Sequence, residues 1–193
     1  MKLDKTYWEE RYEENKQGWD VGYISTPIRT FVDQLNDTSI KILIPGAGRG
    51  YEAQYLHQKG FIHTYVADIV SQPLQHIREV CPDFPKEHLL ETDFFKMKEK
   101  GFDLVLEQTF FCALDPEFRP RYTEKMYDIL KPGGILAGLL FDFPLTDSGP
   151  PFGGSMDEYQ NLFQDKFKIH KLERAYNSIT PRKGKELFFI FEK

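Results

Sequence analysis

The chain has 193 residues, the length of one ordinary domain, and its 40% hydrophobic and 28% charged residues are typical of globular proteins rather than of disordered or fibrous ones. The net charge of −5 and the scattered basic residues argue against a nucleic-acid partner. The longest apolar stretch, Ile135 to Phe141, is too short to cross a bilayer, and the charged start lacks a signal core, so we expect a cytoplasmic protein that does not bind membranes.

The two cysteines and five histidines indicate neither a disulfide framework nor a metal site. Cys81 and Cys112 do not form a C-x-x-C pair, and no two histidines show the i,i+4 spacing typical of zinc ligands on a helix. We therefore expect reduced thiols and no bound metal.

The first predicted strand, 40–44, is apolar and β-branched and runs directly into a glycine-rich turn at 45–50. A helix follows and ends at Gly60. A second strand, 65–67, leads to Asp68 and to a helix that starts at Ser71. Strands that alternate with helices in this way predict a parallel sheet.

The remaining elements continue this alternation. A helix is predicted from Asp115-Pro116 to Lys131-Pro132-Gly133-Gly134, and a capping box of Thr6 with Glu9 predicts an N-terminal helix over 7–16. A Pro/Gly-rich loop spans 144–154. The other predicted elements are strands at 88–91, 102–106 and 135–141, a helix at 156–163, and closing strands at 167–172 and 186–191.

Small and acidic residues follow the predicted strands where a parallel sheet binds ligands. Gly46-Ala47-Gly48-Arg49-Gly50 lets a ligand approach the backbone, and Asp68, Asp93 and Glu107 follow successive strands, so all three are expected to border one crevice. Asp68 suits the two hydroxyls of an adenosine ribose. Asp93, followed by Phe94, offers an acceptor for an adenine amino group beside an aromatic wall.

The glycine pattern by itself leaves the cofactor class open. Its third glycine stands at position 50, one residue earlier than the dinucleotide pattern Gly-x-Gly-x-x-Gly requires. Three interpretations are considered: a methyltransferase that uses S-adenosylmethionine, an NAD(P)-dependent oxidoreductase, and a non-catalytic module that binds a cofactor. The oxidoreductase is second to the methyltransferase, because the only Tyr-x-x-x-Lys spacing, Tyr12 to Lys16, precedes the first strand.

Short motifs spread over almost the whole chain resemble the thiopurine methyltransferase superfamily, and the plant-type thiol and halide methyltransferases in particular. They are Trp8, Tyr12, Trp19-Asp20, Thr26-Pro27, Ile44 to Gly48, Phe102 to Val105, Phe111 to Glu117, Arg119-Pro120, Leu130 to Gly133, Thr146-Asp147, Gly149 to Pro151, Asn177 to Ile179 and Arg182 to Glu186. The resemblance implies one domain, 1–193, with a Rossmann-like class I methyltransferase fold. In that fold the sheet is mostly parallel, with helices on both faces and an antiparallel C-terminal strand.

The resemblance also implies S-adenosylmethionine as the cofactor. Tyr12 stands where the family has Trp, and Gln108 where its halide branch has Tyr. The segment 1–38 is expected to form a lid over the cofactor crevice, because an aromatic face attracts the sulfonium. The residues expected to bind the cofactor are Trp8, Tyr12, Trp19, Gly46, Gly48, Asp68, Asp93, Phe94 and Gln108.

The expected acceptor is a small thiol, hydrosulfide or halide. Methyl transfer from a sulfonium is an in-line displacement, and a thiol with a pKa near 8.5 is already partly ionised at neutral pH, whereas an alcohol needs activation. No catalytic side chain is assigned, and the lack of an obvious catalytic dyad favours such soft nucleophiles. An apolar chamber is expected from Phe110, Phe111, Phe141, Phe143, Phe152 and Tyr176, and Arg119 and Arg182 match substrate-pocket arginines of thiopurine-methylating relatives.

Overall fold

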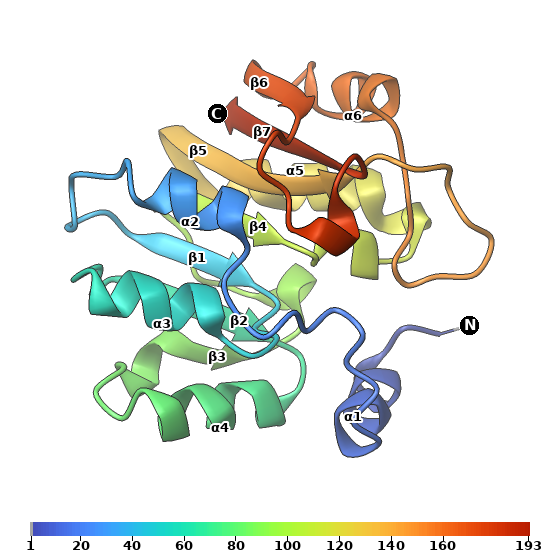
Figure 1. Ribbon diagram of the computed structural model, residues 1–193. Helices are drawn as coiled ribbons and strands as arrows, with labels where there is room; N and C mark the ends of the chain where they lie inside the picture. Colours follow the sequence, from blue (N-terminus) through green and yellow to red (C-terminus); the bar gives the residue numbers. More distant parts are fainter. Residues whose placement is uncertain (1) are drawn as a thin grey trace.

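The computed structural model describes residues 2–193; Met1, the first residue of the expected domain and lid, lies outside them. Its centre is a seven-stranded sheet in the order β3-β2-β1-β4-β5-β7-β6 (Figure 1). β7 pairs antiparallel with β5 and β6, and every other pairing is parallel. The strands are β1 (Ile42–Pro45), β2 (Thr64–Asp68), β3 (Leu89–Glu91), β4 (Phe102–Gln108), β5 (Leu130–Phe141), β6 (Lys168–Arg174) and β7 (Glu186–Glu192).

Helices cover both faces of this sheet. Figure 1 shows α2 (Thr26–Val32), α3 (Tyr51–Gln58) and α4 (Ser71–Val80) in front of the strands, and α5 (Arg119–Ile129) behind them. α6 (Met156–Phe163) packs beside α5. Two apolar cores result, one on each face of the sheet. The predicted fold class, with its antiparallel C-terminal strand, is confirmed.

Strand β1 shows why the sheet needs apolar residues on both faces. Its four residues are all buried. Leu43 packs in the core beneath α5 and α6, whereas Ile42 and Ile44 pack in the core beneath α2, α3 and α4. A strand covered on both faces has no polar side, so a short unbroken apolar run was a valid signal for it.

Gly50 lets the turn after β1 fit against α4. It has a φ of +73°, a left-handed conformation that favours glycine, and a Cβ at this position would lie 2.4 Å from Cγ1 of Ile77. The glycine therefore has a packing role as well as a conformational one.

The structure differs from the sequence prediction at the N-terminal helix. Helix α1 spans Lys5–Glu13, and its cap is Asp4, which accepts a hydrogen bond from the Tyr7 amide at 3.2 Å. The predicted Thr6/Glu9 capping box over 7–16 is therefore wrong in register. A carboxylate at the cap competes well with a hydroxyl two residues later, because both types cap helix N-termini effectively.

Other boundaries moved by a few residues, and α2 was not predicted. β1 begins at Ile42 rather than Ile40, since the Lys41 amide donates to the side-chain carboxylate of Asp103 at 2.8 Å and not to a backbone carbonyl of a neighbouring strand. The helix expected from Asp115 divides into a short 3₁₀ turn and α5. The 3₁₀ turns are η1 (Lys86–His88), η2 (Phe94–Lys96), η3 (Phe111–Ala113), η4 (Pro116–Phe118) and η5 (Thr180–Arg182).

Among the described helices, none has the length and apolar character needed to span a membrane.

Candidate active site

A cavity of about 920 Å³ opens at the carboxyl ends of β1, β2, β3 and β4, where parallel sheets bind ligands. The turn that follows each of these strands contributes to its wall. The segment that includes α1 and the loop after it lines another side. The structure brings all nine residues expected to bind the cofactor to this cavity: Trp8, Tyr12, Trp19, Gly46, Gly48, Asp68, Asp93, Phe94 and Gln108.

The turn after β1 presents bare backbone to the cavity. Gly46 has a φ of +75°, and a Cβ there would lie 2.9 Å from Cδ2 of Phe110. Gly48 has a φ of +53°, with the indole Nε1 of Trp19 as the nearest atom, at 3.7 Å from where a Cβ would stand. Side chains at these positions would fill the space between the turn and the aromatic rings, so the glycines keep a place for a ligand.

Asp68 ends β2 and faces the same turn. Its Oδ2 accepts a hydrogen bond from the Ala47 amide at 2.8 Å, and its Oδ1 accepts one from the Val70 amide at 2.9 Å. Each carboxylate oxygen can accept a further bond, so this fixed carboxylate can still receive ligand hydroxyls. Burial raises its pKa to about 6, because desolvation disfavours the charged form.

Asp93 and Phe94 follow β3 and form the next part of the wall. Asp93 caps the η2 turn, because its Oδ1 accepts a hydrogen bond from the Phe95 amide at 2.9 Å. The Phe94 ring is nearly buried and meets the Phe110 ring edge to face at 5.1 Å. An acceptor therefore lies beside an aromatic surface, as the sequence suggested.

Glu107 does not border the cavity, so the expectation that it joins Asp68 and Asp93 there is wrong. It is fully buried, and its Oε1 accepts hydrogen bonds from the amides of Phe110 and Phe111 at 2.8 and 2.9 Å. Alternate residues of a strand face opposite sides, and the cavity side at the end of β4 belongs to Gln108.

Gln108 connects the cavity wall to the N-terminal half of the chain. Its Oε1 accepts a hydrogen bond from the Ser25 hydroxyl at 3.0 Å, and Ser25 is the buried cap of α2. Directly after Gln108, Thr109 adopts a φ of +57°, which is rare for a β-branched residue. Both residues line the cavity.

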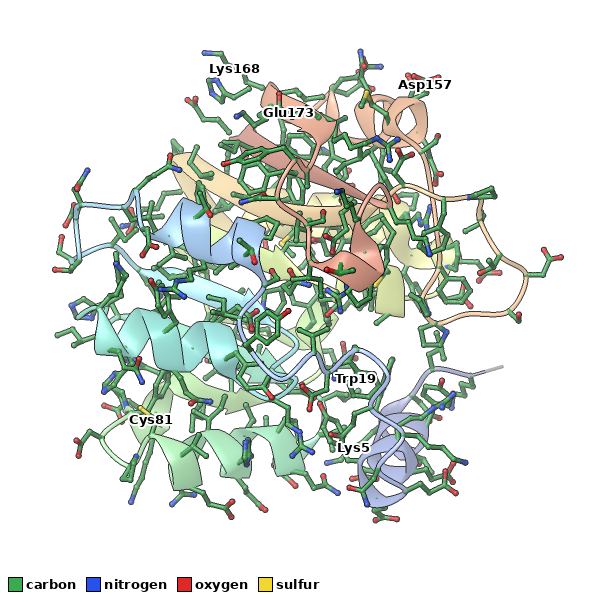
Figure 2. The ribbon with its side chains drawn as sticks, viewed as in Figure 1. Lys5, Trp19, Cys81, Asp157, Lys168 and Glu173 are labelled. Carbon is green, nitrogen blue, oxygen red and sulfur yellow. The ribbon has the colours of Figure 1, made fainter. Side chains whose placement is uncertain are left out.

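Three aromatic rings from the N-terminal segment meet above the glycine turn. The Trp19 ring lies 5.6 Å from the Trp8 ring and 5.7 Å from the Tyr12 ring, both edge to face. Figure 2 shows Trp19 between α1 and the rest of the molecule. Burial, and then the nearby charge of Asp68, raise the pKa of Tyr12 far above its ordinary value, so its hydroxyl stays protonated.

The loop after α1 is tied to the domain by polar contacts. The Asp20 carboxylate accepts hydrogen bonds from Nε of Arg49 at 3.2 Å and from the hydroxyl of Tyr51 at 3.0 Å. Nη2 of Arg182 donates to the Trp19 carbonyl at 3.0 Å. Arg182 is itself buried and lines the cavity, so it links the loop to the cavity wall.

Of the five residues expected at the substrate pocket, Arg182 lines the cavity; Phe111, Arg119, Phe143 and Tyr176 lie elsewhere. Arg119 is buried, donates to the Gly153 carbonyl at 2.7 Å and pairs with Glu158, so it anchors a loop to α6. Its guanidinium lies over the Phe111 ring, which faces the core.

The expected aromatic chamber forms only in part. Phe110 and Phe141 line the cavity, whereas Phe143 and Phe152 do not. Tyr176 is 82% exposed and does not line the cavity. The loops that carry these rings fold back on the domain by contacts distant in sequence, which residue type alone does not predict.

The cavity also contains residues that the sequence analysis missed. Glu52, at the start of α3, is nearly buried, and desolvation raises its pKa to about 7. Cys112, Pro150 and Pro151 come from loops around the wall. Glu52 stands two residues after the last glycine of the turn, so its place at a helix N-terminus was a usable signal. Within residues 2–193, no three His, Cys, Asp or Glu side chains gather as metal ligands would.

Comparisons with known proteins identify the family of the chain. The sequence model of the thiopurine S-methyltransferase family matches residues 3–193. Thiocyanate methyltransferase 1 of Brassica oleracea is 31% identical over 186 residues, covering 93% of this chain and 81% of the relative. Thiopurine S-methyltransferase of Vibrio cholerae is 26% identical over 179 residues, covering 83% and 81%.

Solved structures share the fold. A Burkholderia thailandensis 1,6-didemethyltoxoflavin-N1-methyltransferase, crystallised with S-adenosylhomocysteine, superposes with a TM-score of 0.77 at 17% identity, over 98% of this chain and 86% of that one. A TehB-like S-adenosylmethionine-dependent methyltransferase from Corynebacterium glutamicum gives 0.66 at 16% identity, over 98% and 97%. The chain belongs to the thiopurine S-methyltransferase family and is a methyltransferase that uses S-adenosylmethionine.

Proposed function

We propose that the protein transfers a methyl group from S-adenosylmethionine to a small, soft nucleophile: a thiol, hydrosulfide, thiocyanate or halide. The observation that carries this proposal is one cavity that combines the strand-end carboxylates and glycine turn with an aromatic and cationic wall. The relatives named as thiocyanate and thiol methyltransferases support the acceptor class.

The donor set suits the cofactor. Asp68, held by two backbone amides, keeps lone pairs for the ribose hydroxyls, and Asp93 suits the adenine amino group. The rings of Trp8, Tyr12 and Trp19 offer faces to the sulfonium side of the molecule. S-adenosylmethionine itself supplies an electrophilic methyl group on a positively charged sulfur.

The acceptor side is formed by Phe110, Phe141 and Arg182. Aromatic walls exclude water from the nucleophile, and the buried arginine attracts an anion. Holding the two reactants in line is worth on the order of 7 to 11 kcal/mol, so positioning is the main contribution of the protein to the rate.

We propose further that α1 and the loop to Asp20 form a lid. No residue of α1 is fully buried, Tyr12 being half-buried, and the helix carries Trp8 and Tyr12 over the cavity, so its main contacts are those that would enclose a ligand. Because α2 places Ile28 and Val32 in the core, a shortened chain should begin at Ile24. Cofactor should change tryptophan fluorescence, and the shortened protein should lose activity; a constant signal with full activity would disprove the lid.

The acceptor class is tested by release of S-adenosylhomocysteine with a panel of nucleophiles. We expect turnover with hydrosulfide, an alkyl thiol, thiocyanate and iodide, and little with alcohols or amines of similar size. Activity confined to alcohols and amines would contradict the proposal.

A further inference from the structure

A second, much smaller cavity lies behind the wall of the large one. Its volume is about 10 Å³, the size that holds a single water molecule. It lies between the ends of β4 and β5 and the start of β7. Four of its residues, Gln108, Thr109, Cys112 and Phe141, line both cavities, and the others are Leu139, Leu140 and Glu186.

Glu186 is the charged group of this small cavity. Its side chain is only 1% exposed, and neither of its oxygens has a hydrogen-bond partner among residues 2–193. Nη1 of Arg182 lies 3.5 Å from Oε1, near enough for attraction but not in hydrogen-bond geometry. The Ser178 hydroxyl is the other donor near this carboxylate, and it too lacks a hydrogen bond of good geometry among residues 2–193. Buried carboxylates are normally satisfied, so a water molecule in the small cavity would complete the bonding of Glu186.

We propose that Glu186 accepts the proton of a neutral thiol acceptor through one water molecule held in the small cavity. The inference rests on the proposed function. The thiol proton passes to the water, and a water proton passes to the Glu186 carboxylate. The sulfur lone pair forms the new bond to the methyl carbon, and the bond from that carbon to the cofactor sulfur breaks, leaving its electrons on that sulfur. Glu186 later returns the proton to solvent.

The surroundings of Glu186 favour this role. Arg182 from η5 is the facing cation, and Glu52 of α3, which lines the large cavity, is close enough to Arg182 for their charges to interact. Asp142, which directly follows β5, is paired with Arg174. Desolvation raises the pKa of Glu186 against the opposing effects of the Ser178 hydroxyl and of Arg182, which makes the carboxylate a better proton acceptor than an exposed one.

Cys112, which also lines the small cavity, does not compete for this role. Its Sγ donates to the Thr109 carbonyl at 3.4 Å. Burial raises its thiol pKa, so it remains protonated.

The decisive comparison is between an acceptor that carries a proton and one that does not. The substitution Glu186→Gln keeps the side-chain shape and removes the proton acceptor. For an alkyl thiol of pKa about 8.5, only about 1% is ionised at pH 6.5, so the kcat/KM for thiol relative to that for iodide should fall about 100-fold at that pH. The loss should shrink about tenfold per pH unit and vanish above pH 8.5.

The unmodified protein provides an independent measurement. With Glu186 as acceptor, kcat/KM for the thiol stays level between the raised pKa of the carboxyl and the pKa of the thiol. Without one, it rises about tenfold per pH unit over the same range. A profile of the second kind in the unmodified protein would overturn the inference even if the variant fails to fold.

Glu52→Gln is the matched control, because Glu52 is also buried and acts on Arg182. A similar change in the thiol-to-iodide ratio in both variants would assign the effect to the charge balance around Arg182 and overturn the inference. So would an equal loss for both acceptors in Glu186→Gln. If the unmodified protein methylates neither acceptor, the proposed function fails first, which is a separate result.

Discussion

Replacing Asp68 by Asn should affect the free energy of unfolding and the affinity for the cofactor differently. Asn has nearly the same shape but carries no charge and has only one oxygen, so one of the two amide bonds from Ala47 and Val70 is lost. It also presents an amide where the proposed ribose hydroxyls need an acceptor. The two effects act on different measured quantities.

The stability change follows from the pKa of Asp68. Burial raises that pKa from 3.8 to about 6, a cost of about 3 kcal/mol when the group is ionised. Because the folded-state pKa is raised, this cost is absent below pH 3.8 and complete above pH 6. Asn removes it at pH 7.5, while an unsatisfied amide costs about 1 to 3 kcal/mol. We expect unfolding free energy at pH 7.5 to stay level or to rise by up to about 2 kcal/mol.

Affinity should fall while stability holds. One hydrogen bond to a charged oxygen is worth about 1.5 to 3 kcal/mol, so the Kd for S-adenosylmethionine should rise about 10- to 150-fold at pH 7.5. In the unmodified protein, affinity should decline about tenfold per pH unit below pH 6, as Asp68 becomes protonated. The variant should lack this pH dependence.

Calorimetric titration with S-adenosylmethionine between pH 5 and 8, together with thermal melting, measures both quantities. Asp103→Asn is the matched control, since Asp103 lies at the opposite end of β4, where its Oδ2 accepts a hydrogen bond from the Lys41 amide. The affinity of the Asp103→Asn variant for S-adenosylmethionine should match that of the unmodified protein. A folded Asp68→Asn variant that binds the cofactor within a factor of two would refute the assignment of Asp68.

Three further predictions concern stability and metal dependence. Arg182→Met should cost about 3 kcal/mol and lower Tm by about 6 to 12 °C, because it leaves buried Glu186 without its cation; an unchanged melt would disprove this. Gly50→Ala should destabilise more than Gly133→Ala in denaturant titrations, by about 1 to 3 kcal/mol. Both have positive φ, but only Gly50 meets Ile77, and equal losses would contradict that packing role. A chelator should leave turnover unchanged; inhibition restored by a divalent metal would contradict the sulfonium mechanism.

Local patterns in the sequence were enough to locate most strands and the side of the cavity proposed to bind the cofactor. The apolar run before the glycine turn predicted β1, and Asp68 and Asp93 at strand ends predicted their place in one crevice. These signals are reliable because strand ends of a parallel sheet share an edge whatever the loops do. To predict that Asp68 and Asp93 line the cavity, it was sufficient to know their positions relative to the preceding strand.

Contacts between distant segments decided the rest. Strand alternation and the turn after β4 bury Glu107 and leave Gln108 at the cavity, a difference of one residue that the pattern of strand ends does not resolve. Arg119 looked equivalent to Arg182 in sequence, yet the first anchors a loop and the second lines the pocket. No feature of the sequence led us to expect Glu186 near the cavity. The pairing of β7 with β5 places its carboxylate behind the cavity wall. The sequence thus determined the edge of the sheet proposed to bind the cofactor, because that edge depends on residues close together in the chain. Tertiary packing decided the proposed acceptor side, because the loops that form it meet only in the folded protein.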